Sequence, residues 1–341
     1  MKINNFDFNK NGTYVIAELS ANHNGQLHLA KETIKAAKEI GVDAVKLQTY
    51  TADTITLDHD SPDFMANPDG LWAGKRLYEL YQWAHTPWEW HEELFTYAKE
   101  IGIDIFSSPF DKSAVDFLEQ FDPPAYKIAS FEITDYELIR YTASKMKPII
   151  ISTGIATIQE IQDAVDICRE VGNSQVILLK CTSAYPAPLE DANLKTIPNL
   201  AETFGVMSGF SDHTLGITAP VAAVALGAKV IEKHFILDKS IGGPDADFSL
   251  DKEAFAQMVK AIRDTEKLLG RVDYGMTDRK KQARKYSRSL YVAKDIKKGE
   301  TFTEKNIRSV RPGLGMHPKY LKDILGEKAQ RDYKYGERFK I

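Results

Sequence analysis

The sequence has few cysteines, no long hydrophobic run and no excess of charge of one sign. Its two cysteines, Cys168 and Cys181, are too few for a disulfide framework in 341 residues, so we expect a protein of the reducing cytoplasm. No apolar stretch typical of a secretory signal follows the first residues, and the apolar run at 220–228 is too short to span a bilayer. The formal net charge of −4, from 44 Lys+Arg and 48 Asp+Glu, does not favour nucleic-acid binding. We therefore expect neither a membrane nor a nucleic acid as a partner.

What the chain does contain is a regular alternation of short β-branched runs and amphipathic helical stretches. Runs such as 148–152 are too apolar for a sheet with one wet face and are typical of parallel strands covered on both faces. Eight strand–helix units favour an α/β protein with a (β/α)8 TIM barrel over a doubly wound open sheet. The segment 21–25 after the first strand also lacks a dinucleotide fingerprint. The expected strands are 13–19, 44–50, 104–109, 125–130, 148–154, 175–182, 206–213 and 229–236.

Two segments depart from this alternation. Extra residues rich in Asp, Pro and aromatics separate the second and third strands at 51–85, on the face where barrel enzymes carry functional loops. Later elements are short, which indicates a barrel domain at 1–270, a linker at 271–285 and a small domain at 286–341. The segment 278–288 is strongly basic. A nucleic-acid contact would explain it, but a charged interdomain linker explains it as well.

Polar residues are concentrated at the expected strand ends, where the catalytic groups of (β/α)8 barrels lie. Six of the eight ends carry Ser or Thr, and Lys127 and Lys180 add positive charge, a combination suited to an anionic substrate. Serine and threonine are also common at strand ends that have no function, so both interpretations stay open. The candidates are Glu18, Gln48, Ser107, Ser108, Lys127, Ser130, Glu132, Ser152, Thr153, Lys180, Thr182, Ser183, Ser211, Asp212, His213 and His234.

Two histidines, His213 and His234, end the seventh and eighth strands, which are neighbours in a barrel. Glu232 shares one face of the last expected strand with His234. Two imidazoles with nearby carboxylates suit a divalent metal with open coordination positions, such as Mn²⁺, Co²⁺, Fe²⁺ or Zn²⁺. The alternative is two unrelated histidines, one of them a general base. We expect His91, at the start of a helix, to lie at the surface. Tyr185, with prolines one and three residues later, is expected to lie rigidly over the barrel mouth and to position a substrate.

A set of motifs, spread in order along the chain, resembles the sialic acid synthase family. The motifs are Glu18 with 22–25 (Asn-His-Asn-Gly), 46–49 (Lys-Leu-Gln-Thr), 107–110 (Ser-Ser-Pro-Phe), 126–130 (Tyr-Lys-Ile-Ala-Ser), 152–154 (Ser-Thr-Gly), 181–186 (Cys-Thr-Ser-Ala-Tyr-Pro), 209–214 (Gly-Phe-Ser-Asp-His-Thr), 232–235 (Glu-Lys-His-Phe), 243–245 (Gly-Pro-Asp) and 310–313 (Val-Arg-Pro-Gly). The resemblance implies a (β/α)8 barrel followed by an antifreeze-like SAF domain. It also implies a domain-swapped homodimer that condenses phosphoenolpyruvate with an acetamido-sugar aldehyde to give a nonulosonic acid and phosphate.

The resemblance also implies residue roles. The phosphate and carboxylate of phosphoenolpyruvate would be held by Lys127, Ser108, Ser130, Ser152, Ser183 and Ser211. His213 and His234 would bind the metal, Mn²⁺ with Mg²⁺ or Co²⁺ as substitutes. Arg311 would reach across the dimer to the N-acetyl group of the sugar. The metal-bound water, the aldehyde or the sugar hydroxyls would be held by Glu18, Gln48, Glu132, Tyr185 and Asp245.

One motif indicates the branch of the family. The segment 242–249 resembles pseudaminic acid synthases, because Ala246 stands where the other branches have His and because Phe248 follows. Phe248 near a deoxy carbon would favour a 6-methyl group over a hydroxyl, as in 2,4-diacetamido-2,4,6-trideoxy-L-altrose. The alternatives within the family are N-acetylneuraminate and legionaminate synthases. A metal-dependent sugar aldolase or epimerase, or a non-catalytic sugar-binding protein, are alternatives from other classes.

Overall fold

The structure, a computed structural model, describes residues 1–68 and 71–340. The chain forms two compact units, Met1–Gly270 and Arg271–Ile341. Of the helices within the described ranges, none combines the length and the apolar character needed to cross a bilayer.

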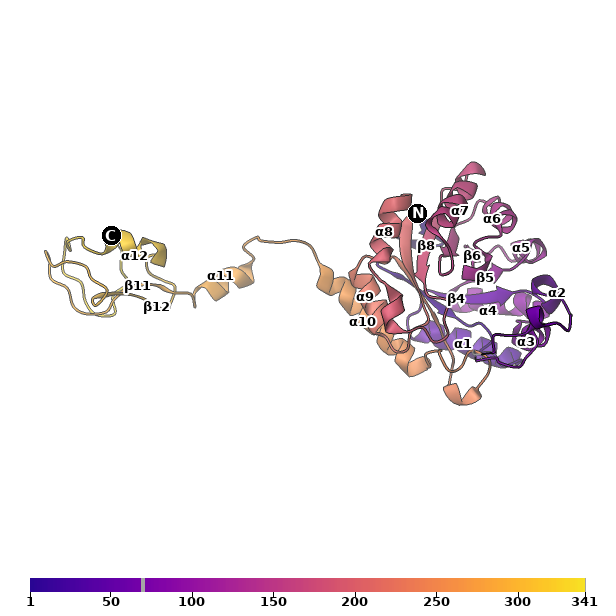
Figure 1. Cartoon of the computed structure of the whole chain (residues 1–341). Helices are drawn as coiled ribbons and strands as arrows, with labels where there is room; N and C mark the ends of the chain where they lie inside the picture. The colour runs from indigo at the N-terminus through magenta and orange to yellow at the C-terminus, as the bar shows by residue number, and fades with distance from the viewer. Residues whose placement is uncertain (69–70, 341) are drawn as a thin grey trace. The chain divides into compact units, whose positions relative to one another are not determined.

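The first unit is a closed barrel of eight parallel strands in the order β10-β3-β4-β5-β6-β7-β8-β9, with helices around it (Figure 1). The predicted (β/α)8 fold is confirmed, and each expected strand differs from the observed one by at most two residues at either end. A two-stranded hairpin that the sequence pattern did not reveal, β1 (Lys2–Ile3) with β2 (Phe6–Asp7), precedes the barrel. The barrel strands are β3 (Tyr14–Glu18), β4 (Ala44–Thr49), β5 (Asp104–Pro109), β6 (Tyr126–Ile128), β7 (Ile149–Ser152), β8 (Val176–Cys181), β9 (Met207–Asp212) and β10 (Val230–His234).

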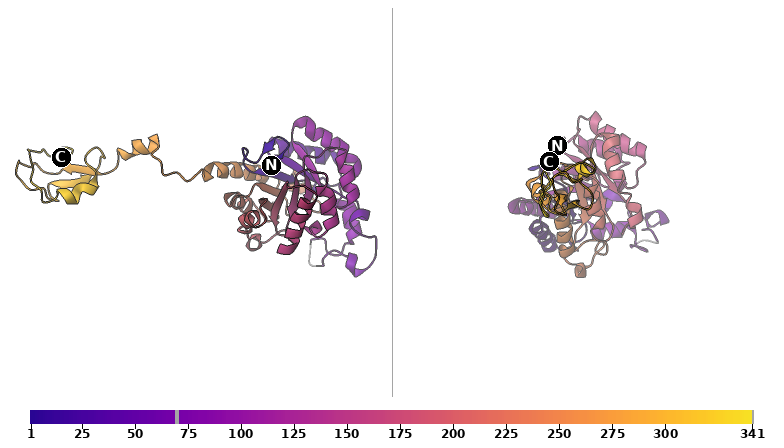
Figure 2. Two further views of the ribbon diagram at one scale, coloured as in Figure 1. Left: turned by 90° about the horizontal axis from the view of Figure 1, so that it is seen from above. Right: turned by 90° about the vertical axis from the view of Figure 1, so that its left-hand side faces the viewer.

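Helices cover the outside of the barrel, as the two views of Figure 2 show. Several begin with side-chain caps. Thr157 caps α7 in a capping box with Glu160, and Asp251 caps α10. The helices of this unit are α1 (Leu27–Glu39), α2 (Ala52–Ile55), α3 (Leu77–Ala84), α4 (His91–Ile101), α5 (Lys112–Glu119), α6 (Tyr136–Ala143), α7 (Ile158–Glu170), α8 (Thr196–Phe204), α9 (Thr218–Ala225) and α10 (Lys252–Leu269).

The alternation of side chains along each strand separates two cores. Outward positions such as Val45, Ile151 and Ile231 pack against the helices, whereas inward positions such as Ile16 and Phe106 fill the barrel. The next inward position toward the carboxyl end of each strand is polar or sulfur-bearing. These residues are Glu18, Lys46, Ser108, Lys127, Ser152, Cys181, Ser211 and Glu232. An apolar floor therefore lies beneath a polar layer at the catalytic end of the barrel.

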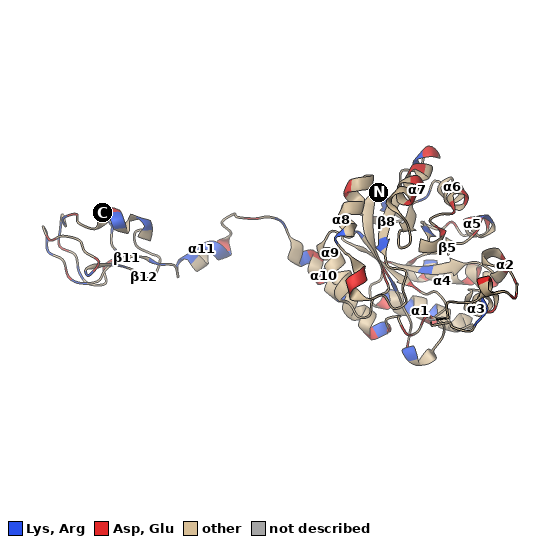
Figure 3. Ribbon diagram, viewed as in Figure 1, with Lys and Arg blue, Asp and Glu red and all other residues tan. Residues whose placement is uncertain are grey.

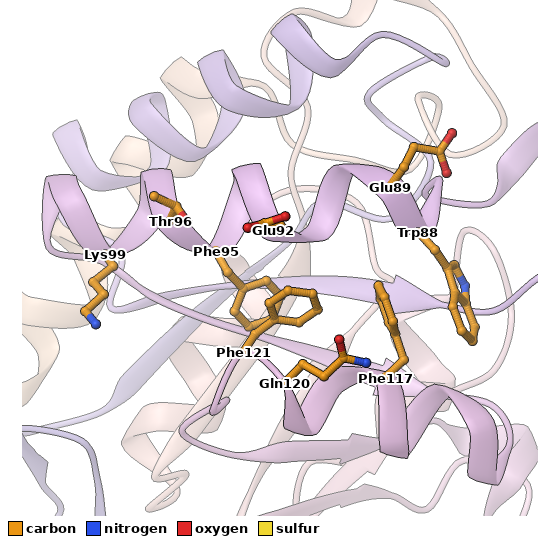
Figure 4. A pocket seen from close by; sticks show the side chains of 9 residues that line it. All are labelled: Trp88, Glu89, Glu92, Phe95, Thr96, Lys99, Phe117, Gln120 and Phe121. Atoms are coloured by element: carbon orange, nitrogen blue, oxygen red, sulfur yellow. The ribbon is translucent and has the colours of Figure 1, made fainter.

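The prediction that His91 lies at the surface was wrong. His91 is fully buried, and its Nε2 lies 2.8 Å from Thr49 Oγ1. Its ring packs edge-to-face on Phe117, which lines a cavity between residues of α4 and α5 (Figure 4). That cavity, about 520 Å³, is also lined by Trp88 and Phe121 and contains no strand-end residue. An amphipathic helix buries one side of its first turn, and His91 lies on that side of α4.

The second unit is small and has its own core. Strands β11 (Ser289–Val292) and β12 (Ile307–Val310) pair antiparallel, and α12 (Leu321–Ile324) packs nearby. Leu290, Phe302 and Phe339 belong to its buried cluster. Helix α11 (Asp278–Arg284) carries the basic segment predicted as a linker, and Figure 3 shows the cationic residues gathered on it.

Candidate active site

Two lysines and two glutamates meet inside the barrel. Lys46 Nζ is ion-paired with Glu18 and lies 3.9 Å from Glu232 Oε1, and Lys127 Nζ lies 3.6 Å from the same oxygen. All four side chains are buried. β10 is a neighbour of neither β4 nor β6 in the barrel, so the contacts of Glu232 with Lys46 and Lys127 cross its interior. Two ammonium and two carboxylate groups give no net charge when all four are ionised. These side chains belong to the polar layer above the apolar floor.

Burial and the neighbouring charges shift the pKa values of the two carboxyl groups in opposite directions. Burial raises the pKa of Glu18 to about 7, although Lys46 opposes the shift. Burial also favours protonation of Glu232, but Lys127 and Lys46 outweigh it and lower the pKa of that carboxyl group. Glu18 can therefore exchange a proton near neutral pH, whereas Glu232 stays ionised.

Hydroxyl groups from neighbouring strands surround the lysines. Lys127 Nζ donates to Ser152 Oγ at 2.7 Å, and Lys46 Nζ donates to Ser108 Oγ at 3.2 Å. Burial lowers the pKa of Lys127. Ammonium and hydroxyl donors that converge on one small volume are suited to a phosphate or carboxylate.

Three further serines complete this ring of hydroxyls. Ser183 Oγ donates to Ser130 Oγ at 2.9 Å, and Ser211 Oγ donates to Glu232 Oε1 at 3.1 Å. A Cβ atom at Gly154 would lie only 2.4 Å from Ser183 Oγ and 2.7 Å from Ser130 Oγ, so glycine allows the loop after β7 to approach them. The structure thus brings all the expected phosphoenolpyruvate-binding serines to one end of the barrel.

Lys180, by contrast, does not join this cluster. It alternates with the inward residue Cys181, and its Nζ donates to Cys181 O at 2.6 Å and to Thr182 Oγ1 at 3.2 Å. The interpretation of Lys180 as part of the anion cradle was therefore wrong, because the strand turns its side chain to the opposite face.

The two strand-end histidines face one another. The rings of His213 and His234 have centroids 5.4 Å apart. His213 Nδ1 lies 3.0 Å from the carbonyl oxygen of Thr182, to which it donates, so its Nε2 carries no proton in the neutral ring. Buried His234 Nδ1 has no hydrogen-bond partner among the described residues. Burial lowers the pKa of both rings, that of His213 to about 4, and neutral imidazoles with open nitrogens are suited to a cation.

Aromatic rings enclose the histidines on the loop side. Tyr185 has its ring centroid 4.4 Å from that of His213, and Phe248 lies 4.8 Å from His234 and 5.2 Å from Tyr185. Phe248 is only 2% exposed, so it supports the Tyr185 and His234 rings from behind. The three loops after β8, β9 and β10 are thereby packed into one wall.

Of the remaining polar candidates, three belong to the barrel unit and Arg311 belongs to the second unit. Gln48 Nε2 donates to Glu18 Oε1 at 3.0 Å, and Asp245 accepts from Ser20 Oγ at 2.5 Å. Burial raises the pKa of Glu132 to about 7, and its Oε2 lacks a hydrogen-bond partner within the described ranges. Arg311 belongs to the second unit, after β12, and its side chain is exposed.

Lys46 and Trp72 received no individual role from the sequence, whereas Glu232 was expected beside His234 on the inward face of its strand. Lys46 shares the inward face with Gln48, so strand alternation was the signal that could have found it. Trp72 comes from the 51–85 insertion, of which the structure describes all but residues 69–70. Its indole N–H donates to Pro244 O at 3.2 Å, and its ring lies 6.2 Å from that of Tyr185.

Comparison with known proteins places this site in a family. Residues 33–274 match the NeuB family, and residues 287–337 match the SAF domain. The chain belongs to the NeuB family. Its barrel and SAF domain therefore agree with the family predicted from the motifs.

Individual relatives of the NeuB family span nearly the whole chain. A pseudaminic acid synthase of Campylobacter jejuni is 52% identical over 340 residues, which is 100% of this chain and 98% of the relative. An N,N'-diacetyllegionaminic acid synthase of Legionella pneumophila is 39% identical, with 95% and 92% covered. The crystal structure of the spore coat polysaccharide biosynthesis protein spsE of Bacillus subtilis superposes with a TM-score of 0.65 at 36% identity, covering 97% of this chain and 94% of that one.

The NeuB family is generally metal-dependent, and the histidine pair fits a cation. His234 Nδ1, which has no hydrogen-bond partner among the described residues, and the unprotonated Nε2 of His213 offer two neutral nitrogen ligands. Within residues 1–68 and 71–340, no group of three or more His, Cys, Asp or Glu side chains is arranged to hold a metal. A cation held by this pair would therefore complete its coordination with water or substrate oxygens.

Proposed function

We propose that this chain is a pseudaminic acid synthase. It condenses phosphoenolpyruvate with 2,4-diacetamido-2,4,6-trideoxy-L-altrose and water to give pseudaminic acid and phosphate. The observation that carries the proposal is the 52% identity, over the full chain, to the Campylobacter jejuni enzyme of that name. The identity to a legionaminic acid synthase is lower, 39%. The segment 242–249, with Ala246 and Phe248, points to the same branch.

In this proposal the polar layer binds phosphoenolpyruvate. Lys127 and Lys46 neutralise the anion, and the hydroxyl groups of the strand-end serines donate to its phosphate and carboxylate oxygens. Because Glu232 holds both ammonium groups inside the barrel, the lysines are already oriented before the substrate arrives. The serines with this role are Ser108, Ser130, Ser152, Ser183 and Ser211.

The histidine pair is proposed to hold a divalent metal, Mn²⁺ with Mg²⁺ or Co²⁺ as substitutes. A metal bound there would withdraw electron density from the aldehyde carbonyl of the sugar. Glu18 and Glu132, each with a pKa of about 7, can accept the proton of the water that adds at C2 of phosphoenolpyruvate. Gln48, Tyr185 and Asp245 position the sugar, and Phe248 shapes the wall that faces its deoxy carbon.

The substrate assignment predicts which aldose is consumed. Purified enzyme with Mn²⁺ and phosphoenolpyruvate is expected to convert the L-altrose derivative at least tenfold more efficiently than the aldoses leading to legionaminic and N-acetylneuraminic acids. Product masses and phosphate release measure this. Preference for another aldose would shift the assignment to a neighbouring branch. Cleavage or epimerisation of a sugar without phosphoenolpyruvate would indicate the aldolase or epimerase class, and binding without turnover a sugar-binding protein.

We further propose a cytoplasmic, domain-swapped homodimer in which Arg311 contacts the N-acetyl group of the sugar in the partner's barrel. Both cysteines are unpaired, in agreement with a reducing compartment. The basic residues of α11 form an exposed segment between the barrel and the SAF domain. A charged, exposed connection of this kind allows the SAF domain to reach a second subunit.

The swap predicts complementation between two inactive variants. In heterodimers of Arg311→Ala and His234→Ala subunits, one barrel is intact and receives an intact SAF domain. Such heterodimers are expected to regain about half of the wild-type activity per dimer. Activity of co-expressed, differently tagged subunits measures this. Heterodimers as inactive as the parents would show that Arg311 serves its own barrel, with each site then carrying one lesion.

A further inference from the structure

A fully buried ion pair joins the two strands that carry the histidines. Lys233 of β10 is directly opposite Asp212 of β9 in the parallel register. Lys233 Nζ lies 2.5 Å from Asp212 Oδ2, and both side chains are 0% exposed. The same Nζ donates to the carbonyl oxygen of Thr214 at 2.5 Å. Because Lys233 alternates with the inward residues Glu232 and His234, the pair lies on the helix side of the barrel wall.

The pair is unlike its surroundings. The neighbouring outward residues Phe210, Ile231 and Phe235 are buried and belong to the core between strands and helices. Moving an ammonium and a carboxylate into such a layer costs several kcal/mol per ion, and apolar residues of similar volume are often equally or more stabilising. Stability therefore does not explain why these two charges lie there.

The contacts of the pair enclose His213. Asp212 and Thr214 flank this histidine in the sequence. Lys233 donates to the carboxylate of Asp212 and to the backbone carbonyl oxygen of Thr214. Asp212 Oδ1 also accepts the backbone N–H of Thr214 at 2.9 Å. Since His234 directly follows Lys233, one ammonium group connects the turn that carries one histidine to the strand that carries the other.

We infer that Lys233 and Asp212 are positioning residues that set the separation and orientation of the His213 and His234 imidazoles. The inference rests on the proposed cation site. Without Lys233, the turn 212–214 loses its side-chain attachment to β10 and keeps only the backbone pairing of the two strands, so the relative placement of the two imidazoles is less well fixed. Groups that orient metal-binding imidazoles typically change metal affinity 10–100-fold when they are removed.

Titration of the metal-free, full-length protein with Mn²⁺, with the free ion followed by electron paramagnetic resonance, tests the inference. Lys233→Met and Asp212→Asn are each expected to raise the Mn²⁺ dissociation constant by about 10–100-fold. Ile231→Val shortens an outward side chain of the same strand and is expected to keep the wild-type affinity. This control separates orientation of the histidines from a general loosening of the layer.

Each single variant leaves one buried charge without its partner, so it is expected to be less stable than wild type. The double variant Asp212→Asn/Lys233→Met leaves no such charge and keeps the test possible if a single variant does not fold. A folded double variant with a Mn²⁺ affinity within about twofold of wild type would overturn the inference.

His213→Ala distinguishes the proposed cation site from the proposed positioning role. Wild-type affinity in His213→Ala would contradict the cation site and the inference together, whereas weakened binding there beside normal binding in the double variant would overturn the positioning role alone.

Discussion

Removal of divalent cations by a chelator is expected to abolish turnover, and His234→Ala is expected to lower kcat by on the order of a thousandfold. His234 presents a buried nitrogen that no described residue satisfies, and burial keeps its ring neutral and able to bind a cation. Loss of the ring removes one of the two imidazoles that the structure brings together at the ends of β9 and β10. Phosphate release from phosphoenolpyruvate and the sugar, measured before and after addition of Mn²⁺, Co²⁺ or Mg²⁺, checks this expectation.

A second buried histidine provides the matched control. Burial also lowers the pKa of His91 to about 4, but His91 lies between α4 and the barrel wall, with both ring nitrogens hydrogen-bonded. His91→Gln is therefore expected to keep the wild-type metal dependence, even where it lowers thermal stability. Full activity of the wild-type enzyme in excess chelator would exclude the metal role of the histidine pair.

The fold could be predicted from the sequence because the strands of a parallel barrel are buried on both faces. Segments such as Ile149–Ser152 are almost wholly apolar, whereas capped amphipathic helices such as Ile158–Glu170 lie between them. Eight such units leave few ways to close a sheet. In such a barrel the carboxyl ends of all strands lie at one rim. The serines and histidines at the strand ends could therefore be named as candidate site residues from the sequence.

The central charge cluster could not be predicted in the same way. Lys46 and Glu232 are far apart in the sequence and lie on strands that are not neighbours, so only closure of the barrel brings them together. Trp72 is a similar case, because nothing in its insertion indicates the contact with Pro244. His91 shows the opposite error, in which a polar residue at a helix start was assigned to solvent although its hydrogen bonds are made inside. Long-range pairs of this kind are properties of the closed structure rather than of any local pattern.

Replacement of Lys127 by methionine is expected to raise the KM for phosphoenolpyruvate by about ten- to a hundredfold. The substitution keeps the length of the side chain and removes an ammonium group that donates to Ser152 Oγ at 2.7 Å and faces the Glu232 carboxylate. A hydrogen bond to a charged group contributes about 1.5–3 kcal/mol, which corresponds to this range. Lys127 lies on β6, whereas His213 follows β9 and His234 ends β10, so Mn²⁺ is expected to remain bound in this variant.

Lys180→Met is the control that makes this prediction specific. Sequence reasoning placed both lysines in the anion cradle, but the structure turns Lys180 toward the Cys181 carbonyl and Thr182. Its loss is therefore expected to leave the KM for phosphoenolpyruvate within about twofold of wild type, since no contact to the inner serines is removed. Steady-state kinetics with phosphoenolpyruvate varied at saturating sugar distinguish the two lysines. Equal increases in KM for both variants would mean that general positive charge at the barrel mouth, rather than the buried Lys127 ammonium, binds the substrate.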